Sequence, residues 1–444
     1  MLTFVAPFVI YLLSFPTMLV TLFRVEIGIL FFLFTVPIIA LMKKFSGFPQ
    51  GNNIADFLLI AIILGWLLGA GKQGKKIFNN SPINIAVILV VIGAIINLVR
   101  GYTFMVLPEE INIVRLMAWK NYMILPLLYF IAINNIETEK LVKWCIVVVS
   151  ITMIAMDFNF YTTFRLIKAV HYSHSIRISG PFAFLGPNEL GVFASMYTFL
   201  LFGISYFIED KKLKYWLLLV CCANFYTILY CYSRAGYMCT LFGFFFLGIL
   251  KDKRFLLLLA ALIIAYKIVL PTSVVERIDN TFLEKGEISE RQEETSAFEV
   301  GDTVVEVTGR KQLWEKAMYY FEREPLFGIG FDTFRHQEGW ITHSLYMKIL
   351  AEQGLVGAII FLIFIAIILS QAFKLFKHSE TKIGKGVGLG FLLCVLVQLV
   401  GSVTGDQSLY YNMMAIYWVF LGIVASLNIN RNQGLTKSPE IDKK

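Results

Sequence analysis

The sequence predicts an all-helical protein that crosses a membrane about twelve or thirteen times and has one large loop with short helices outside the membrane. Hydrophobic residues make up 57% of its 444 residues and charged residues 16%, and the mean hydropathy is +0.70. This composition is far from that of a soluble domain. Apolar runs also approach the ~20 residues that a helix needs to cross the hydrocarbon, and they recur along almost the whole chain.

Thirteen apolar segments are candidate membrane spans. The first run, Phe4–Phe23, has no basic residue before it and is followed at once by another apolar run, which favours a retained span over a cleaved signal peptide. The predicted spans are residues 4–22, 26–42, 54–70, 83–99, 115–135, 142–158, 190–208, 215–231, 235–250, 255–270, 355–373, 386–403 and 409–427.

The basic loops predict the orientation, because Lys and Arg favour the cytoplasmic side. The predicted cytoplasmic segments are Glu137–Lys143, Glu209–Lys214, Lys251–Arg254, Lys374–Lys385 and the tail from Arg431. The outer face then carries Arg100–Val114, Asn159–Glu189, Tyr232–Ala235, Pro271–Ile341 and Thr404–Ser408. The first 80 residues stay open, because Lys72, Lys75 and Lys76 suit the cytoplasm but then place Lys43 and Lys44 outside.

These boundaries divide the chain into a membrane domain (1–270), a large extracytoplasmic loop (271–341), C-terminal membrane helices (342–430) and a cytoplasmic tail (431–444). Pro271–Thr308 is polar and predicts an irregular segment. From Arg310 onward, apolar residues recur at helical spacing and predict an amphipathic helix that ends at Pro325.

The glycines of the PLFGIG sequence, Gly328 and Gly330, predict a tight turn after that helix. A new helix capped by Thr342 or Ser344 would be longer than a bilayer if it ran unbroken to Phe373, so we expect a break at Gly354 and Gly357. His343 would then lie at the outer end of a short helix, whose N–H groups favour an anion.

Composition and motif spacing also argue against several classes of protein. The net charge of +8 comes from short lysine clusters between apolar runs, which indicates membrane topology and not nucleic-acid binding. The six cysteines form no CxxC pair, so we expect neither disulfides nor zinc. His171 and His174 have a spacing that suits a metal, but no third ligand lies nearby in the sequence. Glu109 and Glu110 are acidic residues that could bind a divalent metal, but they lack a D-x-D pattern. We therefore expect no metal and no other cofactor.

A set of motifs in this order resembles the superfamily of O-antigen ligases and Wzy-type O-antigen polymerases. The set comprises SIRISG (Ser175–Gly180), GPNELG (Gly186–Gly191), SRAG (Ser233–Gly236), then Arg310, Trp314, PLFGIG (Pro325–Gly330), His343 and the G-x-x-G of Gly354–Gly357. Family members often have His-Asn where this chain has His343 and Ser344.

The resemblance implies a GT-C-like glycosyltransferase of the bacterial inner membrane with its active site facing the periplasm or cell exterior. Such enzymes take a glycan from undecaprenyl diphosphate. Ligases transfer it to lipid A core, and polymerases transfer it to a second lipid-linked repeat; both acceptors stay open here. A chain-length regulator or a flippase is a possible partner. By resemblance, Arg234 and Arg310 hold the diphosphate, and His343 is a base or a diphosphate contact.

The residue chemistry agrees with this resemblance. Arg177, Arg234, Arg310 and His343 are all assigned to the outer face. The planar fork of arginine matches phosphate oxygens and stabilises the charge that develops on a diphosphate leaving group, so a metal is not needed. A histidine with an ordinary pKa near ~6.5 is suited to take the proton of an attacking sugar hydroxyl.

Each candidate also has a simpler interpretation. Arg234 at the head of a span can extend to lipid headgroups, Arg310 can be a solvated helix start, Arg177 a loop cation and His343 an interfacial histidine. Asn188 more often caps a helix than contacts a substrate. Trp314 belongs to the apolar face of its helix, and Tyr232 to an interfacial aromatic belt that also has rings suited to stack on sugars.

Two other functions remain as alternatives. A transporter or flippase of lipid-linked oligosaccharides predicts charged residues distributed along the spans, whereas the basic residues here gather at one face. A non-catalytic subunit of a polysaccharide assembly complex predicts that replacing Arg234, Arg310 or His343 leaves polymer output unchanged.

Overall fold

A computed structural model describes residues 2–45, 47–48, 53–73, 78–167, 171–182, 185–284, 297–300, 303–306 and 310–432. The helices and strands are α1 (Leu2–Thr21), α2 (Val25–Thr35), α3 (Ile54–Gln73), α4 (Pro82–Phe104), α5 (Glu109–Asn135), α6 (Glu139–Phe164), α7 (Pro187–Ser205), α8 (Lys211–Tyr230), α9 (Arg234–Leu250), α10 (Arg254–Val269), α11 (Thr272–Asp279), β1 (Phe282–Glu284), β2 (Ala297–Val300), β3 (Thr303–Glu306), α13 (Arg310–Arg323), α14 (Thr333–Glu338), α15 (Leu345–His378), α16 (Lys382–Gly401) and α17 (Tyr411–Asn432). Four short 3₁₀ helices complete the set: η1 (Ile39–Phe45), η2 (His174–Ile176), η3 (Gly180–Phe182) and η4 (Gln407–Leu409).

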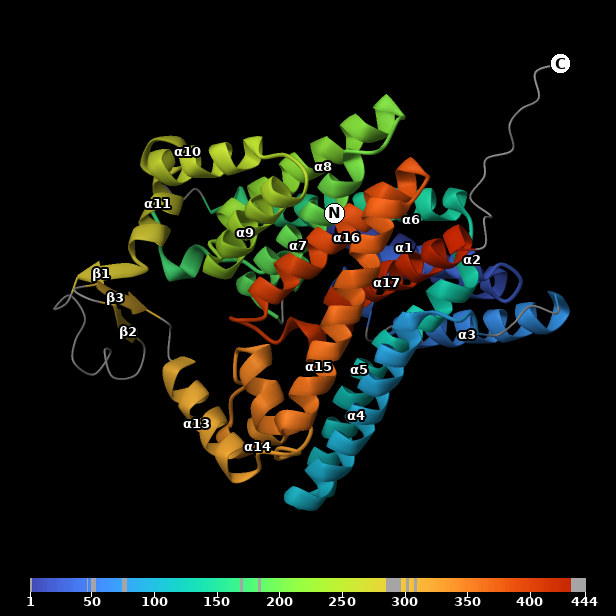
Figure 1. The fold of residues 1–444 in the computed structure, drawn as a ribbon, viewed down its shortest axis with the longest axis horizontal. Coiled ribbons are helices and arrows are strands. Elements are labelled where there is room, and N and C mark those ends of the chain that lie inside the picture. The colour runs from blue at the N-terminus through green and yellow to red at the C-terminus, as the bar shows by residue number, and fades with distance from the viewer. Residues whose placement is uncertain are drawn as a thin grey trace.

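The protein is a helical membrane protein, as predicted (Figure 1). Within the described ranges, seven helices are long and apolar enough to cross a membrane: α4, α5, α6, α8, α15, α16 and α17. The bent pair of α10 and α11, at 111°, would make an eighth. Shorter apolar helices lie within α1, α2, α3 and α9. Every one of the thirteen predicted spans overlaps one of the observed helices.

The second predicted span, 26–42, differs from the structure. The helix α2 ends at Thr35, and the chain continues through the 3₁₀ helix Ile39–Phe45. Pro37 explains this end, because a proline has no N–H group with which to donate the next helix hydrogen bond.

The predicted cytoplasmic loops meet at one end of the molecule, which we call the basic end. Asn430 Nδ2 donates to the carbonyl of Glu137 (2.7 Å), and Arg431 Nη1 donates to the carbonyl of Lys374 (3.3 Å). Lys382 forms an ion pair with Glu209. The described tail thus begins at the basic end; residues 433–444 lie outside the described part of the chain.

The segment that follows α3 also reaches the basic end. The N–H of Asn79 donates to Oδ1 of Asn134, at the end of α5 (2.7 Å). This contact suits the cytoplasmic position favoured for the lysines after α3, of which Lys75 and Lys76 lie outside the described residues.

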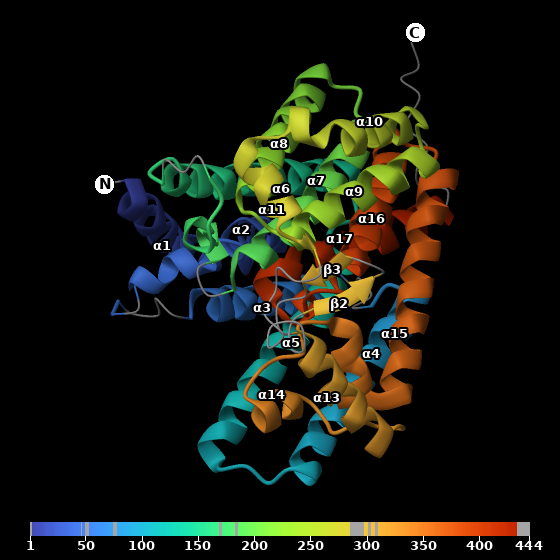
Figure 2. The ribbon, with the colours of Figure 1, turned by 90° about the vertical axis from the view of Figure 1, so that its left-hand side faces the viewer.

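Helices α7, α16 and α17 form the buried centre of the bundle (Figures 1 and 2). Tyr197 of α7 is fully buried, and its hydroxyl donates to the carbonyl of Met413 in α17 (2.6 Å). Gly203 and Gly390 let α7 and α16 approach closely, because a Cβ on Gly390 would lie 2.2 Å from the carbonyl oxygen of Leu200. This rigid centre supports the loops at the opposite end.

The large loop contains more regular structure than its sequence predicts. Where we expected an irregular segment over Pro271–Thr308, the chain forms α11 and a small antiparallel sheet with strand order β1-β3-β2. Phe282 pairs with Val305, and Phe298 pairs with Val305 from the other side. The prediction of a helix from Arg310 is confirmed by α13, which ends two residues before Pro325.

The predicted break in the long C-terminal helix is found at Gly354, which has φ +62° and ψ −157° inside α15. The freed N–H groups of Leu355 and Val356 donate to the carbonyls of Pro325 (2.7 Å) and Leu326 (3.1 Å). The break therefore joins the turn after α13 to α15 and fixes the position of the loop that carries His343.

Candidate active site

The turn between α13 and α14 is built into a crevice between α4 and α15. The N–H groups of Ile329 and Gly330 donate to the carbonyls of Ala351 and Glu352 (both 2.9 Å). Gly328 and Gly330 both have positive φ, and a Cβ on Gly328 would lie 2.4 Å from the carbonyl carbon of Glu352. Only glycine fits here, so PLFGIG is a structural element that positions α13.

Helix α13 is attached to the segment that precedes α15. Trp314 Nε1 donates to the carbonyl of Thr342 (3.1 Å), directly before His343. Tyr320 and Lys316 both contact Glu338 at the end of α14. Trp314 therefore fixes the distance between Arg310, at the start of its own helix, and His343.

His343 itself has left-handed backbone, with φ +51°. This region is costly for a side chain larger than glycine, and such residues tend to occur at functional sites. The N–H of Leu345, the first residue of α15, donates to the carbonyls of Ser402 (3.0 Å) and Gly405 (3.1 Å). This N–H group, which we expected to favour an anion, is thus already used to hold the loop against the α16–α17 connection.

Five charged or titratable side chains act on one another's charges at this end of the molecule, and we call them the charged cluster. Burial lowers the pKa of Arg310, against an opposite effect of Glu189 and with a further lowering by Arg177. Burial also lowers the pKa of His343, with a further lowering by Arg310 and an opposite effect of Asp406. The charged cluster comprises Arg177, Glu189, Arg310, His343 and Asp406.

The charges of both arginines act on the carboxyl group of Glu189. Burial raises its pKa to about 7, Asp406 adds to the rise, and Arg310 and Arg177 oppose it. Glu189 lies in the first turn of α7, ahead of the predicted span. A carboxyl group whose pKa is raised toward neutral pH is typical of functional sites.

The three upstream motifs come together beside the charged cluster. Arg177 Nη2 donates to Oδ1 of Asn188 (2.7 Å), and the hydroxyl of Ser233 contacts the carbonyl and Oδ1 of Asn188 (both 3.4 Å). Ser233 caps α9 by accepting from the N–H of Gly236 (3.0 Å). Asn188 is the second residue of α7 and Gly186 its N-cap, so Asn188 orients Arg177 and does not cap the helix.

Arg234 follows Ser233 as the first residue of α9 and is half-buried. The contacts of Ser233 with Asn188 therefore place the start of α9 next to the start of α7, which carries Glu189. Arg234 thus begins its helix on the same side of the molecule as Arg177.

Tyr232 has a structural role in place of the proposed stacking role. It is fully buried and its hydroxyl donates to Oγ of Ser273 (3.0 Å), while its carbonyl accepts from Nε of Arg277 (3.3 Å). Its φ of +52° is fixed by these contacts. Tyr232 thus connects SRAG to α11, and its ring has no exposed face for a sugar.

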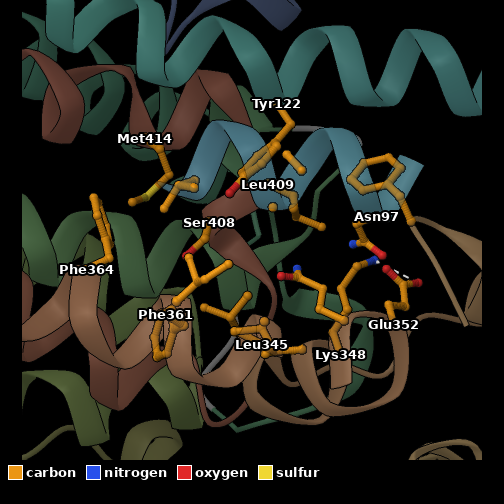
Figure 3. Close-up of a pocket in the computed structure, with 18 of the residues that line it drawn as sticks. Asn97, Tyr122, Leu345, Lys348, Glu352, Phe361, Phe364, Ser408, Leu409 and Met414 are labelled. Atoms are coloured by element: carbon orange, nitrogen blue, oxygen red, sulfur yellow. Dashed lines mark ion pairs between the residues drawn. The ribbon is translucent and has the colours of Figure 1, made fainter. Parts of the chain in front are cut away.

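A buried set of charges behind His343 has no counterpart in the sequence predictions. Lys348 Nζ lies 3.7 Å from Oε1 of Glu352 and 3.7 Å from Oδ2 of Asp406, and all three side chains are buried. Lys348 and Glu352 line a cavity of about 80 Å³ between α4, α15 and α17, beside Asn97 and Ser408 (Figure 3).

Sequence reasoning missed Glu189, Lys348, Glu352 and Asp406. Glu189 stands inside the GPNELG motif, and Lys348 and Glu352 have i,i+4 spacing just before the glycine break. Asp406 is an isolated acid between two apolar spans, a pattern that often marks a functional residue.

Metal ligation finds no support among the residues that the structure describes, since no three His, Cys, Asp or Glu side chains gather in a way that could hold an ion. His171, one of the candidate metal ligands, lies 2.6 Å from Glu276 through Nδ1. His174 lies against the ring of Tyr172.

The fold and site define a multi-pass membrane protein with a partly buried charged cluster at one end of its helical bundle. The family model described as O-antigen ligase matches residues 217–362, a region that contains Arg234, Arg310, His343 and the Gly354 break. No curated protein matches the chain. This match supports the resemblance to the O-antigen ligase and polymerase superfamily that the motifs predict.

Proposed function

We propose that this protein is a glycosyltransferase that moves a whole glycan from undecaprenyl diphosphate to a hydroxyl group of an acceptor glycan. The acceptor is lipid A core or a second lipid-linked glycan, and the reaction takes place at the outer face of the bacterial inner membrane. The observation that carries the proposal is the charged cluster, in which the charges of two arginines, a half-buried histidine and two carboxyl groups act on one another.

The arginines supply the site for the diphosphate. Arg310 and Arg177 are close enough for each other's charge to matter, with Arg310 largely withdrawn from water. Two positive charges held near each other repel, so the site favours a ligand with negative charge. Arg234, at the start of α9, would complete the contacts, and Glu189 would balance the arginines while the site is empty.

The chemistry is an exchange at the anomeric carbon of the donor sugar. The acceptor oxygen forms a bond to this carbon while its bond to the diphosphate breaks, and undecaprenyl diphosphate leaves with the bonding electrons. The acceptor proton passes to His343. Since the pKa of His343 lies below its ordinary value, the imidazole is neutral at pH 7 and free to accept that proton.

Reconstituted protein tests the proposal directly. Wild-type protein in liposomes, given a lipid-linked oligosaccharide and an acceptor glycan, should form product in the presence of a chelator. Arg310→Ala and Arg234→Ala should each abolish transfer while the protein still inserts. Arg431→Ala, an arginine at the basic end, is the matched control and should transfer at the wild-type rate.

Two outcomes would contradict the scheme. Activity that is lost in chelator and restored by a divalent ion would rule out catalysis by arginines alone. Full activity of both alanine variants would remove the charged cluster from the reaction. Gel analysis of a deletion strain then separates the acceptors: long chains kept on the carrier indicate a ligase, and single repeats indicate a polymerase.

A further inference from the structure

Lys348 is a buried lysine without an evident task in the transfer scheme. Its side chain is 6% exposed, and it lies on the first, outer segment of α15, five residues after His343. A buried ammonium group has lost its hydration, which is unfavourable, so it persists where it neutralises buried carboxylates. Lys348 does so twice, through Glu352 and Asp406, each at 3.7 Å.

The two carboxylates differ in their other partners. Glu352 also accepts hydrogen bonds from the N–H groups of Asp332 (3.1 Å) and Phe334 (3.3 Å), at the start of α14. Asp406 is 3% exposed, and among the described residues Lys348 is its ion-pair partner. When Lys348 is removed, Glu352 therefore keeps its two N–H donors. Asp406 then loses its ion pair.

Asp406 in turn acts on the proposed base. The charged groups that act on His343 are Arg310 from α13, which lowers its pKa, and Asp406 from the α16–α17 connection, which raises it. Lys348 is acted on by Glu352, Asp406, Asp332 and Tyr410, and Asp406 also acts on Glu189 of α7. The loop of Asp406 is held against the histidine segment by the N–H of Leu345, which donates to Gly405.

We infer that Lys348 is a positioning residue of the transfer site, which holds the Asp406 side chain by an ion pair in the loop that lies against the segment of His343. The inference rests on the proposed function for its link to glycan transfer. The Asp406 carboxylate stabilises the imidazolium that forms when His343 takes the acceptor proton. Without Lys348, the Asp406 side chain loses the ion pair that holds it, so His343 loses this support.

The experiment uses full-length protein in nanodiscs with three variants at two positions, Lys348 and Glu352, and one control. Lys348→Met removes the charge at similar length, and Lys348→Arg keeps it. Glu352→Gln removes the other carboxylate and leaves the pair of Lys348 and Asp406 intact. Lys382→Met removes a lysine of a surface ion pair at the basic end and is the matched control.

The first readout does not depend on transfer. Modification of His343 by diethyl pyrocarbonate, followed against pH by mass spectrometry, reports the pKa of that one imidazole. We expect a lower pKa in Lys348→Met, and an unchanged pKa in Lys348→Arg, Glu352→Gln and Lys382→Met. An unchanged pKa in folded Lys348→Met, or an equal fall in Glu352→Gln, would overturn the inference.

The second readout is transfer itself. Lys348→Met should lower kcat about tenfold or more, part of the roughly 10²–10⁴ that a positioned general base contributes, with the KM for the lipid-linked donor nearly unchanged. Lys348→Arg should recover most of the rate. A wild-type protein that transfers no glycan would contradict the proposed function, while the His343 titration still decides the role of Lys348. An unchanged kcat in Lys348→Met would overturn that role.

Discussion

Replacing His343 distinguishes its effect on glycan transfer from its effect on the stability of the fold. Its φ of +51° costs about 1–2 kcal/mol for any residue with a Cβ, and glycine avoids this cost. Glycine also loses about 0.5–1 kcal/mol more chain entropy than alanine on folding. His343→Gly should therefore be more stable than His343→Ala by about 0.5–1 kcal/mol, and both should be inactive.

Thermal unfolding of the two variants in the same detergent measures this difference, and reconstituted transfer measures the activity. Loss of transfer in the more stable glycine variant would show that His343 is kept for chemistry at the expense of stability. Equal stability of the two variants would refute the strained backbone. Transfer by either variant would remove His343 from the reaction.

Two further predictions concern the scaffold and the pH dependence. Gly328→Ala should lower stability strongly and reduce transfer, because its Cβ would lie 2.4 Å from the carbonyl carbon of Glu352 at a φ of +62°; Gly339→Ala, also at positive φ but with open space around it, is the control for backbone strain alone, and equal unfolding midpoints for the two would contradict the packing argument. Burial raises the pKa of Glu189 to about 7, so the native state holds this proton above the pH at which the unfolded chain releases it, and stability should fall as pH rises from about 4.5 through 7. Glu189→Gln should show a flatter dependence of its unfolding midpoint over pH 5 to 8, and a slope equal to that of the wild type would refute the buried carboxyl group.

The fold was largely predictable because its strongest signals are local. Each apolar run forms a helix, because lipid offers the backbone N–H and C=O groups no other hydrogen-bond partner. The amphipathic spacing after Arg310 and the glycine at 354 likewise act within a few residues. The exceptions are also local in origin: Pro37 ends α2 early, and the polar segment of β1 to β3 has strands too short to give a periodic pattern.

The site was only partly predictable because its remaining members are joined by the tertiary fold. Arg310 and His343 carry a motif, so sequence alone singled them out. Asp406 and Lys348 are 58 residues apart and meet because α15 begins against the α16–α17 connection. Glu189 belongs to the site because the charges of Arg177 and Arg310, which lie in other segments, act on it. Single charges of this kind show no periodicity or spacing from which their contacts could be inferred.

The position of a bound carrier tests the central claim most directly. A structure of the full chain with undecaprenyl diphosphate should show the two phosphates in contact with Arg310 and Arg177, and His343 facing the carbon from which the diphosphate departs. Phosphates bound at the basic end, or held away from both arginines, would contradict the account.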